Sequence, residues 1–158
     1  MLHIFSDLEG IRIAVEMERR GESFYRHAAR VSKCADTVAM LNGLARDEQL
    51  HGAEFERLFA NESGQLSGDA YDDETNAYLS AVAADVVFPS GLMALKDDGF
   101  ENPAAVLKNA IASEKDSIMF YNELQAHTHD EHAKDVFSEI VRQERGHLHL
   151  LQRQLDQL

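Results

Sequence analysis

The sequence is poor in cysteine and proline. Cys34 is the only cysteine in 158 residues, which excludes an internal disulfide and any zinc or iron–sulfur site built on cysteines. The chain has two prolines, and no useful length of it alternates polar and apolar residues as a half-buried strand would. These absences predict an all-α protein. The length predicts a single domain, residues 1–158, with a hydrophobic core of its own.

Basic residues and long apolar runs are scarce as well. Lysine and arginine number 15 against 28 aspartates and glutamates, a formal net charge of −13. A nucleic-acid binder would need a basic stripe, and an anionic membrane surface would repel such a chain. No apolar run approaches roughly 18 residues, and the N-terminus lacks the basic-then-apolar pattern of a signal peptide. We therefore expect a cytoplasmic protein without nucleic-acid or membrane partners, whose acidity suits the capture of cations.

The chain carries one short motif twice, Glu-x-x-His, as Glu48/His51 and Glu144/His147. Residues three apart on a helix share a face, and each pair continues an apolar stripe. One such motif alone would more simply be a polar pair on a solvated face. A carboxylate and an imidazole in a buried stripe need partners, and a metal ion suits both. The stripes consist of Leu41, Leu44, Phe55 and Leu58 around the first motif and Phe137, Ile140, Leu151 and Leu155 around the second.

The two motifs belong to an internal repeat with an offset of 96 residues, spanning 14–59 and 110–155. Each half reads Ala, then Glu four residues later, then Phe-Tyr, and then Glu-x-x-His thirty residues after the first Glu. The first glutamates are Glu18 and Glu114, and the tyrosines are Tyr25 and Tyr121. The residues that are identical in the two halves are mostly ones whose side chains can bind metals or form hydrogen bonds, which chance would not favour.

The helical signals predict four long helices in two antiparallel hairpins. Ser6 is placed to cap the first helix, and Asn102, followed by Pro103, to cap the third. The connector at about 61–102 is long enough to bring the third helix parallel to the second. We therefore expect an antiparallel four-helix bundle with a long crossover that contains short helices. The long helices are predicted at 6–30, 36–60, 103–127 and from 130 nearly to the end, and the short ones at Glu74–Ala84 and Gly91–Asp97.

Such a bundle would bring one glutamate from each helix, and two histidines, into its core. Their four carboxylates would neutralise two divalent cations, so we expect a carboxylate-bridged dinuclear metal site. Glu48 and Glu144 are the expected bridges, and each histidine would bind one metal. Oxygen and imidazole donors favour iron or manganese, with zinc as a further substitute. The predicted ligands are Glu18, Glu48, His51, Glu114, Glu144 and His147.

Other residues leave alternatives open. Tyr25 and Tyr121 are predicted to hydrogen-bond the carboxylates from outside, or else to be core aromatics. A buried salt-bridge network without metal would need cations, and the stripes offer no inward lysine or arginine. The loop histidines His127, His129 and His132 are more simply surface residues than a second metal site.

The paired Glu-(x6)-Tyr and Glu-x-x-His hairpins resemble the rubrerythrin branch of the ferritin-like superfamily, and the segment Ala110 to Tyr121 is especially similar. The resemblance implies a ferritin-like fold, two iron ions, reduction of hydrogen peroxide and often a homodimer. Rubrerythrins carry a four-cysteine rubredoxin-like domain that this chain lacks, so electrons would come from a separate donor such as a rubredoxin. Ser117 stands where rubrerythrins usually have an additional glutamate, which leaves a six-ligand site closer to ferritin-like ferroxidase centres.

Together these features predict a non-haem di-iron oxidoreductase that reduces hydrogen peroxide or dioxygen with electrons from an external donor. The alternative is an iron-binding or ferroxidase protein for iron sequestration or delivery, which the acidity and the missing electron-transfer domain favour. An oxygenase would need an apolar pocket beside the site for its organic substrate.

Overall fold

The computed structural model describes residues 3–60, 66–84 and 99–158, and within these ranges the chain is helical with no strand. The all-α prediction is therefore confirmed. The short helix predicted at Gly91–Asp97 lies outside the described residues. The helices are α1 (Asp7–Val31), α2 (Ala35–Phe59), α3 (Asp73–Val82), η1 (Gly99–Glu101), α5 (Pro103–His127) and α6 (Glu131–Asp156).

Side-chain caps fix where the long helices begin. The hydroxyl of Ser6 accepts a hydrogen bond from the Glu9 amide at 3.1 Å, and this starts α1. Asn102 caps α5 through the Ala105 amide at 3.2 Å, with Pro103 in the first turn, as the sequence predicts. The helices begin and end within one or two residues of their predicted bounds, which sets the register of the functional side chains.

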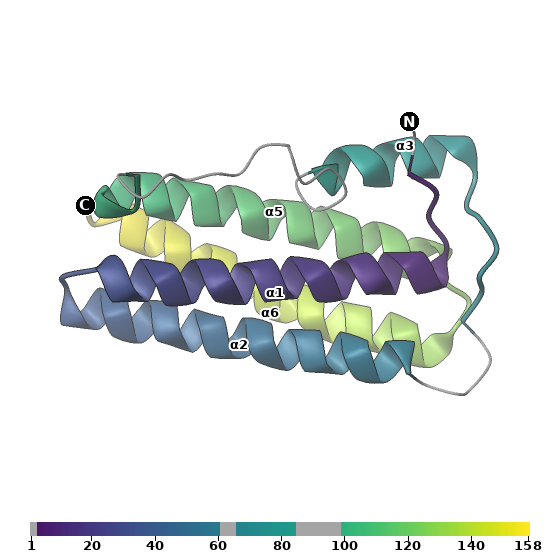
Figure 1. The fold of residues 1–158 in the computed structure, drawn as a ribbon, viewed down its shortest axis with the longest axis horizontal. Helices are drawn as coiled ribbons and strands as arrows, with labels where there is room; N and C mark the ends of the chain where they lie inside the picture. The colour runs from purple at the N-terminus through teal and green to yellow at the C-terminus, as the bar shows by residue number, and fades with distance from the viewer. Residues whose placement is uncertain (1–2, 61–65, 85–98) are drawn as a thin grey trace.

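The four long helices form a bundle of two hairpins, α1 with α2 and α5 with α6 (Figure 1). Across the hairpins α1 packs on α5 and α2 packs on α6. All four of these neighbouring pairs are antiparallel, whereas the diagonal pair α2 and α5 runs in one direction (Figure 1). The predicted crossover is thus present, and its helix α3 packs against α5. None of the described helices is long and apolar enough to span a membrane.

The core is divided into two apolar clusters along the bundle. One includes Phe5, Phe55, Phe120 and Phe137, near the start of α1 and the end of α2. The other includes Tyr25, Leu41, Leu44, Leu107 and Leu151, near the opposite end. On every long helix the sequence passes from one cluster to the other, and the predicted ligand residues fall between them. The predicted ligand residues therefore form a polar layer in the core, with an apolar cluster on each side of it along the bundle axis.

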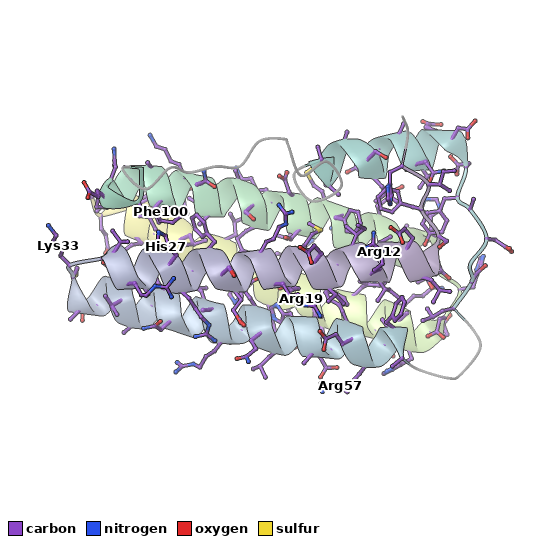
Figure 2. The ribbon with its side chains drawn as sticks, viewed as in Figure 1. Arg12, Arg19, His27, Lys33, Arg57 and Phe100 are labelled. Carbon is purple, nitrogen blue, oxygen red and sulfur yellow. The ribbon has the colours of Figure 1, made fainter. Side chains whose placement is uncertain are left out.

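The outer surface of the bundle is charged, and η1, at the end of the connector, packs against α1. Arg12, Arg19 and Arg57 project from the outer faces of α1 and α2 (Figure 2). At the other end Phe100 of η1 meets His27 of α1 edge-on, with ring centroids 4.4 Å apart (Figure 2). This contact holds η1 against α1 just before α5 begins.

Candidate metal centre

All six predicted ligand residues lie in the polar layer at the centre of the bundle. Each long helix supplies one glutamate, and α2 and α6 each supply a histidine one turn further on. Their relative exposures run from 0% to 6%, so all six side chains are buried. The structure brings together Glu18, Glu48, His51, Glu114, Glu144 and His147.

The six residues form two overlapping groups of four. Each group offers four ligand atoms that all lie within 4.8 Å of one another. Glu48 and Glu144 belong to both groups, which is the arrangement expected of bridging carboxylates. We call the group of Glu18, Glu48, His51 and Glu144 position A, and the group of Glu48, Glu114, Glu144 and His147 position B.

Both histidines direct Nδ1 into the cluster. Nδ1 of His51 lies 3.2 Å from Glu144 Oε1 and 3.6 Å from Glu18 Oε2. Nδ1 of His147 lies 2.9 Å from Glu144 Oε2 and 3.3 Å from Glu48 Oε1. Nδ1 is therefore the nitrogen that would bind a metal in each position.

The outward nitrogens have partners that sequence reasoning missed. Nε2 of His51 lies 2.8 Å from the side-chain oxygen of Gln143, and Nε2 of His147 lies 3.0 Å from Asp47 Oδ2. Gln143 and Asp47 each directly precede the glutamate of a motif, at equivalent positions of the repeat. That shared position was the available signal, but a residue one step from a buried position would be expected to face away from the site.

Both tyrosines hydrogen-bond a carboxylate of the cluster. The Tyr25 hydroxyl donates to Glu114 Oε1, and the Tyr121 hydroxyl donates to Glu18 Oε1, both at 2.6 Å. Each tyrosine thus serves the glutamate of the other half of the repeat. Burial and the adjacent carboxylates raise the pKa of both hydroxyl groups well above 10, so both remain neutral donors.

The cluster contains buried oxygens that lack a hydrogen bond. Oε2 of Glu18 and Oε1 of Glu48 accept none from the described part of the chain, although each lies within 4 Å of a histidine Nδ1. An unsatisfied buried carboxylate oxygen is costly unless a cation is bound beside it. Oxygens aimed at a common centre, with neutral imidazole available, fit a pair of divalent ions such as iron or manganese.

Without metal, protons must balance the four carboxylates. Burial alone would lower the pKa of His51, but the adjacent carboxylates of Glu144 and Glu18 raise it to about 10. The pKa of His147 is likewise raised to about 11 by the adjacent carboxylates of Glu114 and Glu144. Burial, and then the neighbouring carboxylates, raise the pKa of Glu48 well above its usual range. The apolar stripes offer no inward lysine or arginine, so in the metal-free protein the two protonated histidines supply the positive charge that balances the carboxylates.

A pocket of about 370 Å³ reaches the cluster from between α1 and α5. It is lined by Glu48 and Glu114, by Ser117, and by Gly21 on the facing helix. A Cβ atom at Gly21 would lie 2.7 Å from Glu48 Oε2, so a side chain at this position would push that carboxylate out of its place. The walls mix polar and apolar side chains. Of the two ligand residues in the lining, Glu48 is shared by both positions and Glu114 belongs to position B only.

The loop histidines lie outside this centre. His127 contacts Glu123 at 2.9 Å and Thr75 at 3.4 Å, and His129 and His132 are exposed. Among the described residues no candidate metal group includes any of the three. They are ordinary residues of the α5–α6 turn.

Comparisons with known proteins agree with this architecture. A ferritin-like diiron-carboxylate protein of Thermotoga maritima matches with a TM-score of 0.72 and 21% identity, over 99% of this chain and 98% of that one. A hypothetical protein of Pyrococcus furiosus matches with a TM-score of 0.68 and 22% identity, over 96% of this chain and 89% of that one. At these identities both show the fold, which is ferritin-like. A search of curated proteins finds no significant match. The Rubrerythrin family model matches residues 9–155, nearly the whole sequence, and the chain with its two-position carboxylate and histidine cluster belongs to the rubrerythrin family.

Proposed function

We propose that this protein is a non-haem di-iron oxidoreductase that reduces hydrogen peroxide, or dioxygen, with electrons from a separate donor such as a rubredoxin. The observation that carries the proposal is the pair of overlapping four-residue groups that share Glu48 and Glu144. Two iron ions held by these residues would supply the two electrons that, with two protons, reduce hydrogen peroxide to two water molecules. Membership of the rubrerythrin family supports iron and peroxide over other metals and oxidants.

The residues of this chain would hold and insulate such a pair of ions. Tyr25 and Tyr121 donate short hydrogen bonds to Glu114 and Glu18. These bonds orient the two non-bridging carboxylates toward the metal positions. The apolar clusters above and below exclude bulk water. The pocket beside Glu48 and Glu114 supports entry of a small oxidant next to position B.

A ferroxidase or iron-delivery role is the second candidate. The formal charge of −13 raises the concentration of cations around the protein, which suits the uptake of iron. A peroxidase would instead be re-reduced repeatedly with its two ions in place. The two roles therefore differ in what happens to the metal after oxidation.

The test is anaerobic loading with Fe(II), followed by stopped-flow oxidation with hydrogen peroxide and, separately, with dioxygen. The proposal expects two irons per chain, faster reaction with peroxide, and repeated turnover with reduced rubredoxin. Uptake beyond two irons, or no turnover with a donor, would move the function to ferroxidase. Glu144→Ala is expected to abolish dinuclear binding, whereas Glu131→Ala on the exposed start of the same helix is expected to leave it intact.

A further inference from the structure

The two histidines of the metal centre are held from outside by different chemical groups. Asp47 presents a carboxylate oxygen to His147 Nε2, whereas Gln143 presents an amide oxygen to His51 Nε2. The rest of the cluster nearly repeats itself, since each half supplies one glutamate, one Glu-x-x-His and one tyrosine. The repeat is therefore broken at the two positions that contact the ligand histidines.

The orientation of the Gln143 amide is set by the structure itself. Its Nε2 donates to Glu139 Oε1 at 2.9 Å, which leaves the amide oxygen to face His51. Both histidines therefore donate Nε2–H outward, and a bound metal would take the inward Nδ1 of each ring. The two histidines differ in which group accepts the outward proton.

A carboxylate acceptor and an amide acceptor affect an imidazole ligand differently. A carboxylate accepts the stronger, charge-assisted hydrogen bond and makes the imidazole a more basic metal ligand. It also brings one more negative charge near the bound cation. The neutral amide of Gln143 orients the ring of His51 without adding charge. Each position has three glutamates and one histidine, so the two positions match in the number and charge of their ligands. They differ in the residue that accepts the hydrogen bond from the histidine.

We propose that the two metal positions are inequivalent, and that position B, with His147 held by Asp47, binds a divalent ion more tightly than position A, with His51 held by Gln143. The inference deepens the proposed function, because it rests on the binding of two metal ions at this cluster. The pocket supports the same order of filling. Of the ligand residues that belong to one position only, Glu114 of position B lines the pocket, whereas Glu18 and His51 of position A and His147 of position B do not. An ion that enters through the pocket meets the tighter position first.

The size of the effect follows from the exposure of Asp47. Loss of a partner hydrogen-bonded to a metal ligand typically costs about 10-fold to 100-fold in metal affinity. The Asp47 side chain is 47% exposed, so solvent weakens its influence and we expect about 10-fold.

The experiment is a titration of the full chain with Co²⁺, followed by absorption and with a competing chelator, which gives two stepwise dissociation constants. The wild type is expected to show two separated steps. Asp47→Asn, which keeps the shape and an acceptor oxygen but removes the charge, is expected to weaken the tighter step about 10-fold. Asp36→Asn, the same change on an exposed residue of α2, is the matched control and is expected to change neither step.

The identity of the first position is read from the histidine ring signals in the NMR spectrum. At one equivalent of the paramagnetic ion, the signals of His147 are expected to shift before those of His51. Equal affinities in the wild type, an Asp47→Asn variant that matches Asp36→Asn, or earlier shifts of His51 would each overturn the inference while leaving the metal centre in place. Binding of fewer than two ions by the wild type would instead overturn the proposed function.

Discussion

Metal binding to this centre is expected to release protons. In the metal-free protein the pKa of His51 is about 10 and that of His147 about 11, so both rings are protonated at pH 7. A metal ion binds the Nδ1 lone pair, which a protonated ring does not offer. Loading of both positions must therefore displace about two protons at pH 7, and any proton held by Glu48 or Glu144 adds to that number.

The magnitude follows from linkage. Each proton released makes the apparent affinity rise about 10-fold per pH unit, so the product of the two binding constants is expected to rise about 100-fold per unit between roughly pH 7 and 9. The rise should level off only as the pH approaches about 10, where His51 loses its proton in the metal-free state. A cluster with neutral histidines and ionised carboxylates would show no such slope.

Calorimetric titration with Mn²⁺ in two buffers of different ionisation enthalpy measures the number of protons released. Two or more per chain at pH 7.5 is the expected outcome. His129→Gln is the matched control, because His129 is exposed and lies outside the cluster, and its proton release should equal that of the wild type. A release near zero in the wild type would refute the charge balance argued for the metal-free state.

Three further outcomes are expected. Gly21→Ala places a Cβ atom 2.7 Å from Glu48 Oε2, so it should lower the affinity for Mn²⁺ and reduce thermal stability. Gly43→Ala, whose Cβ atom would meet only the end of the Arg46 side chain at 4.0 Å, should stabilise the protein by about 0.5–1 kcal/mol. Tyr121→Phe removes the hydrogen bond to Glu18 and should destabilise the fold by about 1–3 kcal/mol, measured by denaturant unfolding. Folding raises the pKa of both histidines, so their protonated rings stabilise the metal-free protein fully below pH 6.5. This stabilisation should be lost as the pH rises from 6.5 through about 10. Melting temperatures at pH 6.5 and 9 test this, and the loss should be absent in the metal-loaded protein.

The bundle and the six clustered residues could be predicted because each depends on local spacing. Glu144 and His147 are three apart in an apolar stripe, so any helix there must bury both on one face. The repeat then placed Glu48 and His51 in the same setting. Ser6 and Asn102 act as caps in the structure, because a capping residue needs only the first turn of its own helix.

The features that escaped prediction depend on how the helices are rotated against each other. Asp47 and Gln143 reach a histidine on another helix, and nothing within their own helix indicates that contact. Gly21 reads in the sequence as an ordinary helical glycine, yet its missing side chain makes room for a carboxylate of α2. The raised histidine pKa values likewise come from carboxylates that only the folded bundle brings near.

The hydrogen bonds around the cluster have a consequence for its two halves. Tyr25 and Tyr121 reach glutamates of the opposite half, and Asp47 and Gln143 reach histidines of the opposite half. One hairpin alone holds only half of the donor set and none of the partners that orient it. A free hairpin of this sequence pattern would complete the centre only by pairing with a second copy. Two identical hairpins would present the same residue to both histidines. Because the two halves are separate segments of one chain, Asp47 and Gln143 can differ, and the two metal positions can differ with them.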